Sequence, residues 1–260
     1  MDPADLNVVN DLIRSLWSDG SCESFPSLPS TQDAVRTKAR AGAGEGTVCV
    51  ADIQTSGRGR QGRTWEGEKS SSLLFSVLLS MHDAPVGIMP LAAGCAVAEA
   101  AAAVGAPDCQ LKWPNDIMFK RRKLAGILCE GIAERPEFVV VGIGINLSSS
   151  DVTRRLGACS LDEAAGSPVT RLAMLTAVLP QLARLTRLPA TDICEVWTSR
   201  AVGLGESLVV ETPGATITGI AREIAPDGSL ILQTQSGDVR CVAGDVHLLP
   251  ATHADNSSAT

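Results

Sequence analysis

The stretch most suited to chemistry is residues 54–65, Gln-Thr-Ser-Gly-Arg-Gly-Arg-Gln-Gly-Arg-Thr-Trp. It interleaves three arginines and three glycines: Arg58, Arg60 and Arg63 with Gly57, Gly59 and Gly62. Guanidinium groups offer planar sets of donors that suit carboxylate and phosphate oxygens, and glycines let a backbone approach a ligand closely. The stretch follows the apolar run 47–53, which is typical of a buried strand. We therefore expect a mobile basic loop that grips a small anion, unless it is only a solvated basic turn.

The same glycines satisfy the dinucleotide fingerprint G-x-G-x-x-G. That fingerprint requires a helix to begin at the third glycine and to receive the pyrophosphate at its N-terminus. The residues that follow, Arg-Thr-Trp-Glu-Gly-Glu-Lys-Ser-Ser-Ser, show no helical spacing of apolar side chains. The dinucleotide-binding interpretation is therefore rejected.

A second group of polar residues lies between 110 and 131, where apolar and polar residues alternate on both sides of the basic tetrad 120–123. This pattern predicts two strands joined by a turn. Pro114 interrupts the first strand and places Asn115 and Asp116 at a bulge or bend. Another strand, 137–143, runs into Gly-Ile-Gly-Ile-Asn, whose alternate glycines leave one face bare for a flat ligand or another backbone.

Residues 90–104, made largely of alanine, predict a core helix. Helical spacing elsewhere predicts helices over residues 5–17, 168–188 and 191–201, and a further helical stretch runs from Ser30 to 42–44. Ser30 is expected at the N-cap of that stretch, where its hydroxyl either caps the helix or meets a ligand. Residues 73–79 predict a buried strand. After Gly205, four short strands separated by turn residues predict a small all-β domain built as a barrel: 207–211, 216–224, 229–234 and 239–242.

Composition narrows the class of protein. The net charge of −7 over 260 residues disfavours non-specific binding to nucleic acid. The eight cysteines form no C-x-x-C pair, which argues against a metal or disulfide framework. The acidic N-terminus does not resemble a signal peptide, and the apolar run 91–105 falls short of the roughly 20 residues of a membrane span. We expect a reducing, cytoplasmic protein that does not enter a membrane.

Three motifs stand together: Ser-Thr-Gln at 30–32, the Gly-Arg loop at 54–65, and Lys-Trp-Pro-Asn-Asp-Ile at 112–117 followed by Lys-Leu-Ala-Gly-Ile-Leu at 123–128. With Gly-Ile-Gly-Ile-Asn at 142–146 and the C-terminal β module, they resemble biotin protein ligase. The resemblance implies a mixed α/β catalytic domain over 1–204, an SH3-like β-barrel over 205–250 and a polar tail over 251–260. The form it resembles has no N-terminal DNA-binding domain.

The resemblance also implies a two-step reaction. Biotin and MgATP give biotinyl-5′-adenylate and pyrophosphate, and a lysine of a biotin carboxyl carrier protein then takes the biotinyl group. The carrier belongs to acetyl-CoA carboxylase or a related carboxylase. The usual acceptor context, Met-Lys-Met, is absent from this sequence, so the acceptor is expected on another polypeptide. Binding to DNA is not expected, and the chain is either a monomer or a homodimer.

Residue by residue, the resemblance assigns Ser30, Thr31, Gln54, Gly126 and Gly142 to the biotin pocket. Gln32 stands where the family usually has asparagine, and its role stays open. The charged groups of ligand and phosphates fall to Arg58, Arg60, Arg63, Lys112 and Lys123, with Gly57 allowing close approach. Positions around the adenylate are Trp65, Asn115 and Asn146. Asp116 is expected to orient the acceptor lysine or Mg²⁺, whose other ligands the motifs do not identify.

Three alternatives remain. Lipoate and octanoyl protein ligases share the catalytic fold but differ in their loop and lysine motifs. A biotin-binding sensor without activity is disfavoured because every charge-handling position is intact. A biotin-operon repressor would need more chain before residue 30 than this sequence has.

Overall fold

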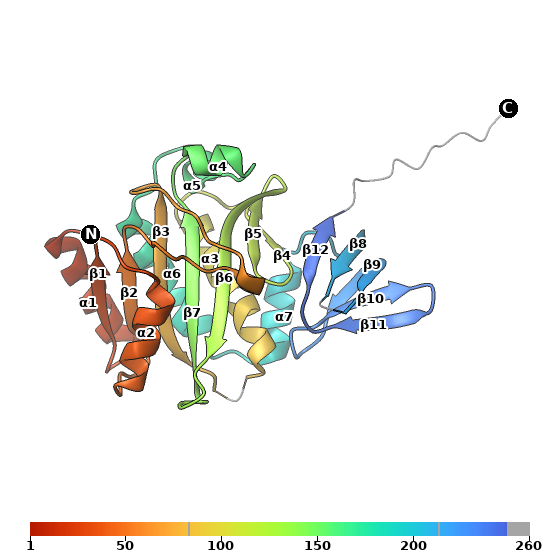
Figure 1. Cartoon of the computed structure of the whole chain (residues 1–260), viewed down its shortest axis with the longest axis horizontal. Helices are drawn as coiled ribbons and strands as arrows, with labels where there is room; N and C mark the ends of the chain where they lie inside the picture. The colour runs from red at the N-terminus through yellow and green to blue at the C-terminus, as the bar shows by residue number, and fades with distance from the viewer. Residues whose placement is uncertain (83, 213, 249–260) are drawn as a thin grey trace.

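The computed structural model describes residues 1–82, 84–212 and 214–248, and Figure 1 shows two β-sheets with helices around the larger one. The larger sheet has seven strands in the order β1-β2-β3-β7-β6-β5-β4. β1 and β2 are parallel, and the other neighbours are antiparallel. The strands are β1 (Ser21–Phe25), β2 (Thr47–Ala51), β3 (Ser72–Ser80), β4 (Gln110–Lys112), β5 (Asp116–Phe119), β6 (Arg122–Gly131) and β7 (Phe138–Asn146).

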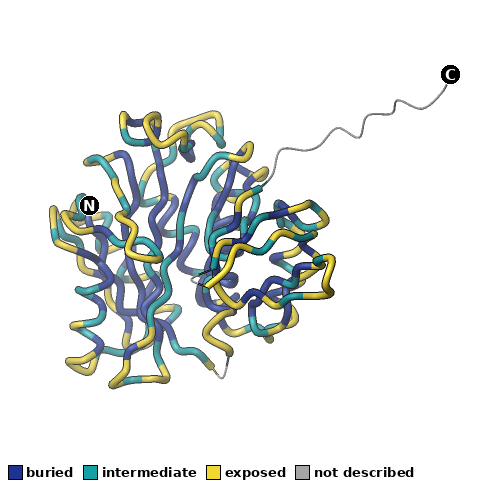
Figure 2. Tube along the Cα trace, turned by 45° about the vertical axis from the view of Figure 1, so that its right-hand side comes forward, coloured by how far each residue is buried: buried dark blue, intermediate teal, exposed yellow. Residues whose placement is uncertain are grey.

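Helices cover both faces of this sheet, so its central strands are buried on both sides, as Figure 2 shows. α2 packs on β2, β3 and β7. On the opposite face α3 and α6 pack against each other, α3 against β4, β5, β6 and β7 and α6 against β3. Strands enclosed in this way are apolar at nearly every position, as in the Ser-Leu-Leu-Phe-Ser-Val-Leu-Leu-Ser run of β3. The helices are α1 (Pro3–Leu16), α2 (Thr31–Arg40), α3 (Met89–Ala103), α4 (Asp151–Arg155), α5 (Leu161–Ala165), α6 (Arg171–Leu185) and α7 (Ala190–Thr198), with short 3-10 turns η1 (Arg60–Gly62) and η2 (Val86–Ile88).

The predicted alanine-rich core helix is α3. By length and composition, the segment 86–103 would qualify as a membrane span. In the structure it is a core helix, because α3 is buried along most of its length and packs closely against α6. Alanine side chains allow that close approach without leaving cavities.

The C-terminal sheet has five antiparallel strands in the order β11-β10-β9-β8-β12. Within the part of the chain that the structure describes, no strand pairing joins β11 to β12, so the predicted closure into a barrel is not seen. The predicted tail 251–260 lies outside the described residues. The strands are β8 (Ser207–Glu211), β9 (Thr216–Ile224), β10 (Leu230–Thr234), β11 (Gly237–Cys241) and β12 (Asp245–Leu248).

The two sheets are joined by buried contacts. The indole Nε1 of Trp113 donates a hydrogen bond of 2.9 Å to the carbonyl of Gly228 in the turn before β10. Gly87 lies against the same turn, and a Cβ there would stand 2.4 Å from the carbonyl oxygen of Asp227. The C-terminal sheet is therefore fixed beside β4 and β5.

One strand prediction was wrong. Residues 110–119 do not form a single strand with a bend at Pro114; the chain reverses there, and Lys112 of β4 pairs with Asp116 of β5. The Trp113–Pro114 peptide bond is cis. Asn115 therefore lies in a tight turn that points toward β6, where its Nδ2 donates to the carbonyl of Ile127 at 2.7 Å.

The outer edge of the larger sheet is occupied by a side chain. β1 is the terminal strand, and Asn10 of α1 lies beside it. The Asn10 Nδ2 donates to the carbonyl of Cys22 at 3.2 Å, and the Cys22 N–H donates to Asn10 Oδ1 at 2.8 Å. Both backbone groups of Cys22 that face outward are thereby satisfied.

The eight cysteines are free thiols. Burial raises the pKa of Cys22, Cys49, Cys95 and Cys109 to about 12. Because the thiolate is the reactive form, these thiols should be nearly inert at pH 8. We expect Ellman's reagent to leave these four unmodified in the folded protein and to modify all eight cysteines after denaturation in guanidinium chloride. Rapid modification of any of the four in the folded state, located by peptide mass analysis, would contradict the burial of these thiols.

Candidate active site

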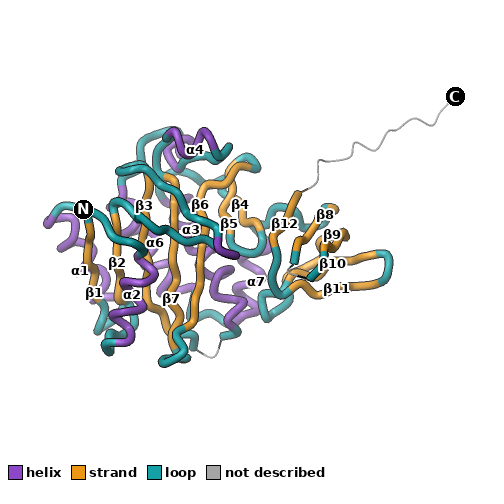
Figure 3. The backbone as a smooth tube through the Cα atoms, in the orientation of Figure 1, coloured by secondary structure: helices purple, strands orange, loops and turns teal. Residues whose placement is uncertain are grey.

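The floor of the site is one face of the larger sheet, where strand register places small residues side by side. Gly144 of β7 pairs with Leu74 of β3 and with Gly126 of β6, and the row continues through Asp116 of β5 to Lys112 of β4. The next row joins Ser76, Gly142 and Leu128. The loop 52–71 crosses this face of the sheet (Figure 3). The missing side chains in adjacent strands leave room for a cavity beneath it. The cavity has a volume of about 140 Å³.

The bare glycine face predicted from residues 142–146 is occupied by side chains of this chain. The Trp65 ring lies on Gly144, where a Cβ would stand 2.4 Å from Trp65 Cε2, and on Gly126. Gln32 lies on Gly142 in the same manner, with 2.7 Å between its Oε1 and a Cβ built there. The flat group on Gly126 and Gly144 is thus the indole ring of Trp65 rather than another backbone.

One end of the cavity is lined by hydroxyl and amide groups. Thr31 donates through its backbone N–H and its Oγ1 to Gln54 Oε1, at 2.7 and 3.0 Å, and its Oγ1 lies 2.7 Å from the Oγ of Ser76. Ser30 occupies the N-cap position of α2 but makes no side-chain capping hydrogen bond. The hydroxyl of Ser30, which is buried, is therefore available to a ligand.

The other end is cationic. The Arg60 guanidinium donates to Asn115 Oδ1 at 3.3 Å and to the carbonyl of Gly244 at 3.2 Å, and burial lowers its pKa. Arg63 forms an ion pair with Asp245, at the start of β12. Both contacts bring the C-terminal sheet to the rim of the cavity.

Lys123 reaches this end from β6. Its Nζ lies 2.6 Å from Asp116 Oδ1, and 5.5 Å from the centre of the Trp65 ring. The two charged atoms form an ion pair, although their angles do not make a hydrogen bond. Lys123 is thus part of the cavity and not merely of a solvated turn.

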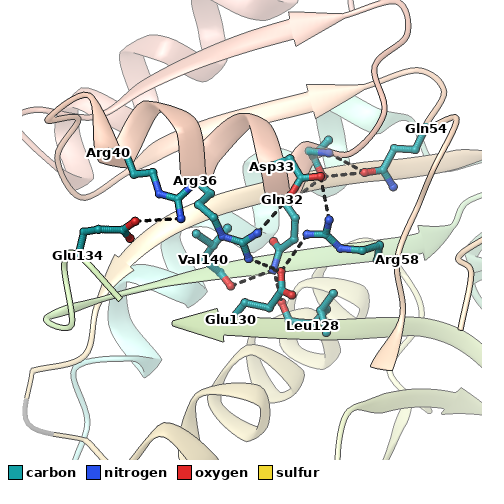
Figure 4. Close-up of polar contacts among 12 residues, drawn as sticks. Gln32, Asp33, Arg36, Arg40, Gln54, Arg58, Leu128, Glu130, Glu134 and Val140 are labelled. Atoms are coloured by element: carbon teal, nitrogen blue, oxygen red, sulfur yellow. Dashed lines mark hydrogen bonds and ion pairs between the residues drawn. The ribbon is translucent and has the colours of Figure 1, made fainter. Parts of the chain in front are cut away.

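Arg58 points to the rim and joins a cluster that we call the Glu130 network: Gln32, Asp33, Arg36, Arg58 and Glu130. Figure 4 shows Gln32 and Arg58 converging on the Glu130 carboxylate. Arg58 donates to Asp33 at 2.8 Å and to Glu130 at 3.1 Å. These contacts raise the pKa of Arg58, and the hydrogen bond to Asp33 has the largest effect.

All but three of the predicted site residues line this cavity: Ser30, Thr31, Gln32, Gln54, Arg58, Arg60, Arg63, Trp65, Asn115, Asp116, Lys123, Gly126 and Gly142. Gly57 instead packs on the backbone of Trp65, since a Cβ would stand 2.5 Å from the Trp65 carbonyl oxygen. Asn146 lines an adjoining hollow with Trp65 and Lys123, and its Nδ2 donates to the carbonyl of Cys159. Lys112 lies beside the cavity, where burial lowers its pKa.

Several lining or supporting residues were not predicted. Glu130 gives a signal in the sequence, because it is the lone carboxylate in the apolar strand of β6. Ser76 likewise interrupts an apolar strand. Asp245 follows no motif, and only the tertiary contact between the two sheets brings it to Arg63.

Known proteins resemble this chain over most of its length. It is 35% identical over 228 residues to the biotin:acetyl-CoA-carboxylase ligase of Mycobacterium tuberculosis, covering 84% of this chain and 85% of that protein. It is 34% identical to the bifunctional ligase/repressor BirA of Bacillus spizizenii, covering 85% of this chain and 72% of that protein. The biotin protein ligase of Aquifex aeolicus in complex with biotin and ATP superposes with a TM-score of 0.75 at 28% identity, covering 88% of this chain and 98% of that one.

Family models agree with these likenesses. Residues 24–146, which carry the glycine rows and the basic loop, match the biotin/lipoate A/B protein ligase family, so the sheet and cavity define a protein ligase of that class. Residues 203–249 match the biotin protein ligase C terminal domain. The chain belongs to the biotin protein ligase family.

Proposed function

We propose that this chain joins biotin to a carrier lysine in two ATP-dependent steps, with biotinyl-5′-adenylate as the intermediate. The observation that carries the proposal is the cavity itself, which has hydroxyl and amide groups at one end and Arg60, Arg63 and Lys123 at the other. A neutral polar head group suits the first end, and a carboxylate next to phosphates suits the second. The acceptor is a biotin carboxyl carrier protein of acetyl-CoA carboxylase or a related carboxylase.

In the first step, a carboxylate oxygen of biotin attacks the α-phosphorus of ATP, and the bond to pyrophosphate breaks. Carboxylate and phosphates repel, so the site must supply fixed positive charge where water is largely excluded. Lys123 and Arg60 supply it, with Lys112 beside them. Trp65, Asn115 and Asn146 surround the adenylate.

In the second step, the amine of the carrier lysine attacks the carbonyl carbon of the adenylate, and AMP leaves. The attacking amine must lose a proton. Asp116 follows Gly126 in the glycine row and lies beside Lys123, with a buried Oδ1 that makes no hydrogen bond. That oxygen orients the amine or serves the metal ion.

Mg²⁺ fits this end of the cavity. It typically takes one or two carboxylates and otherwise uses phosphate oxygens and water, and Asp116 and Asp245 are the carboxylates that line the cavity. Among the described residues, no group of three or more metal-binding side chains occurs, which agrees with binding as MgATP. When bound, the ion supplies further positive charge to the phosphates.

We assign residues 1–204 to the catalytic domain and 205–250 to an SH3-like domain, of which β8 to β12 are the strands. The contacts of Arg60 and Arg63 with Gly244 and Asp245 support a role of this domain at the active site. The eight free cysteines favour a reducing, cytoplasmic setting. The chain acts as a monomer or homodimer without binding DNA.

The test is pyrophosphate release from ATP with biotin, lipoate or octanoate in separate reactions, followed by mass analysis of an added carboxyl carrier domain. Biotin-dependent release and a biotinyl adduct on the carrier lysine are expected. Release with lipoate alone would assign the chain to lipoate ligation. No release with any acid would refute the catalytic proposal.

Arg60→Gly should let the intermediate escape. Two hydrogen bonds anchor Arg60 at the rim. One charged hydrogen bond from Arg60 to the adenylate is worth about 1.5–3 kcal/mol, so we expect biotinyl-adenylate to dissociate about 10- to 100-fold faster from the variant. The measurement is release of preformed adenylate after rapid dilution. Arg121→Gly is the control, because Arg121 already has a positive φ and its partner is Glu206, outside the cavity. Equal release from the parent and Arg60→Gly would refute this role.

A further inference from the structure

The short helix α4 is completed by a side chain from another part of the chain. Its N-cap residue Ser150 accepts from the N–H of Thr153, and these two residues form a capping box. The N–H groups of a first helical turn have no partner within their own helix. That of Val152 donates instead to Glu68 Oε1, at 2.9 Å. Glu68 belongs to the loop 52–71, so this hydrogen bond joins α4 to the loop that crosses the cavity.

The backbone of the loop is fixed where Glu68 leaves it. The carbonyl of Glu68 accepts from the N–H of Ser71 at 3.2 Å and from its hydroxyl at 2.9 Å. The carbonyl of Ser71 in turn accepts from the N–H groups of Leu147 and Ser148, at 2.8 and 3.1 Å. The Glu68 carboxylate is therefore carried by a turn that is itself bonded to the segment leading into α4.

A second contact joins the loop to the other end of α4, where Glu66 forms an ion pair with Arg155. Both side chains are exposed, and an exposed pair contributes little to stability. The partly buried hydrogen bond from Val152 to Glu68 is the stronger of the two links. It is the contact on which the position of α4 depends most.

The loop and α4 form opposite walls of the hollow that adjoins the cavity. This hollow has a volume of about 150 Å³; the loop lines it with residues 64–66, and α4 and its C-cap line it with Val152, Thr153 and Leu156. Trp65 and Lys123 line both the hollow and the cavity. A group bound in the hollow would therefore lie next to a group bound in the cavity. The width of the hollow is set by the distance between α4 and the loop.

We propose that Glu68 is a positioning residue, which holds the first turn of α4 to the loop and so keeps this wall of the hollow in place for the nucleotide. The inference rests on the proposed function, in which Trp65 and Asn146 surround the adenylate; both line the hollow. Glu68 lines neither the hollow nor the cavity, so it acts through α4. A helix of five residues does not hold its shape alone, and its place depends on such contacts.

The test compares two neutral variants, Glu68→Gln and Glu68→Met. Both remove the charge and keep the length of the side chain, but only glutamine keeps an oxygen that accepts from Val152. Loss of a side-chain acceptor in a first helical turn corresponds to about 3- to 30-fold in an equilibrium constant. We expect amide hydrogen exchange of residues 150–156, measured by peptide mass analysis, to be about 3- to 30-fold faster in Glu68→Met than in Glu68→Gln. Exchange of β3 should be equal in both.

Ligand affinities separate positioning from a general loss of stability. In Glu68→Met, the KM for ATP in biotin-dependent pyrophosphate release should be about 3- to 30-fold higher than in Glu68→Gln. Calorimetric binding of biotin without nucleotide should be the same in both variants. Glu134→Met is the matched control, because Glu134 forms an exposed ion pair with Arg40 and lines neither cavity nor hollow. It should leave exchange of residues 150–156 and the KM for ATP unchanged.

Equal exchange of residues 150–156 in Glu68→Gln and Glu68→Met would overturn the inference. So would a Glu68→Met variant that weakens the binding of biotin and of ATP alike. The exchange comparison needs no ligand, and it decides by itself whether Glu68 holds α4. Failure of pyrophosphate release in the parent would therefore count against the proposed function alone.

Discussion

Lys123→Met is expected to slow formation of biotinyl-adenylate about 100- to 1000-fold, the loss seen when one fixed group that stabilises developing charge is removed. Methionine keeps the length and most of the volume of the side chain. It removes the charge that lies 2.6 Å from Asp116 and beside the Trp65 ring. Single-turnover formation of adenylate from biotin and ATP measures the effect.

Lys120→Met is the matched control. Lys120 belongs to the same basic tetrad, but its Nζ lies over the ring of Phe119, at 5.1 Å from the centre, and it does not line the cavity. We expect its rate to stay within about twofold of the parent, since an exposed charge contributes little. Equal losses in the two variants would mean that the tetrad acts only through its net charge, and the assignment of Lys123 would fail.

Gly144→Val is expected to destabilise the fold and to displace the Trp65 ring from the sheet. A Cβ at this position would stand 2.4 Å from Cε2 and 2.7 Å from Cζ2 of the indole ring, which is rigid and therefore has to be displaced as a whole. Overpacking of this kind costs about 1–3 kcal/mol. We expect a lower urea midpoint and a red shift of tryptophan fluorescence as Trp65 leaves the sheet.

Gly131→Val tests whether the effect belongs to the ring contact. Gly131 ends the neighbouring strand β6, and a Cβ there meets nothing within 4 Å. Valine favours extended backbone, so this variant should be as stable as the parent or slightly more so. If Gly144→Val unfolds at the parental urea concentration, the Trp65 contact does not constrain that glycine.

Elements with a clear period were predictable from the sequence. The apolar runs of β3 and α3 and the helical spacing of α1 and α6 follow directly from side-chain burial on one face or all round. β1 was missed because Ser-Cys-Glu-Ser-Phe has too few apolar residues to mark a strand. The five-residue helices α4 and α5 were missed because they are little more than one turn long. β12 was missed because only two of its four residues are apolar.

The hairpin of β4 and β5 shows a different limit. An alternating pattern over residues 110–119 is equally compatible with one bent strand and with two short strands. Only the pairing of Lys112 with Asp116 decides between them, and pairing is a property of the whole sheet. The residue types of the turn were predictable, but the direction of the chain after it was not.

The motifs predicted most of the cavity lining, since motif residues are selected to meet one ligand. What they could not predict is which partner each side chain takes within the protein. Arg58 is a ligand-binding candidate by its motif, yet its guanidinium lies between Asp33 and Glu130. Such competition depends on tertiary distances that no spacing in the sequence reveals.

The amide of Asn10 has a consequence for association between chains. An outer strand normally offers its free N–H and C=O groups as a template for another strand. At Cys22 both groups are already taken by Asn10, which imitates a neighbouring strand for the length of one residue. A second chain that extended the sheet at β1 would first have to displace this side chain and the helix that carries it. α1 therefore blocks the addition of another strand to the sheet at β1.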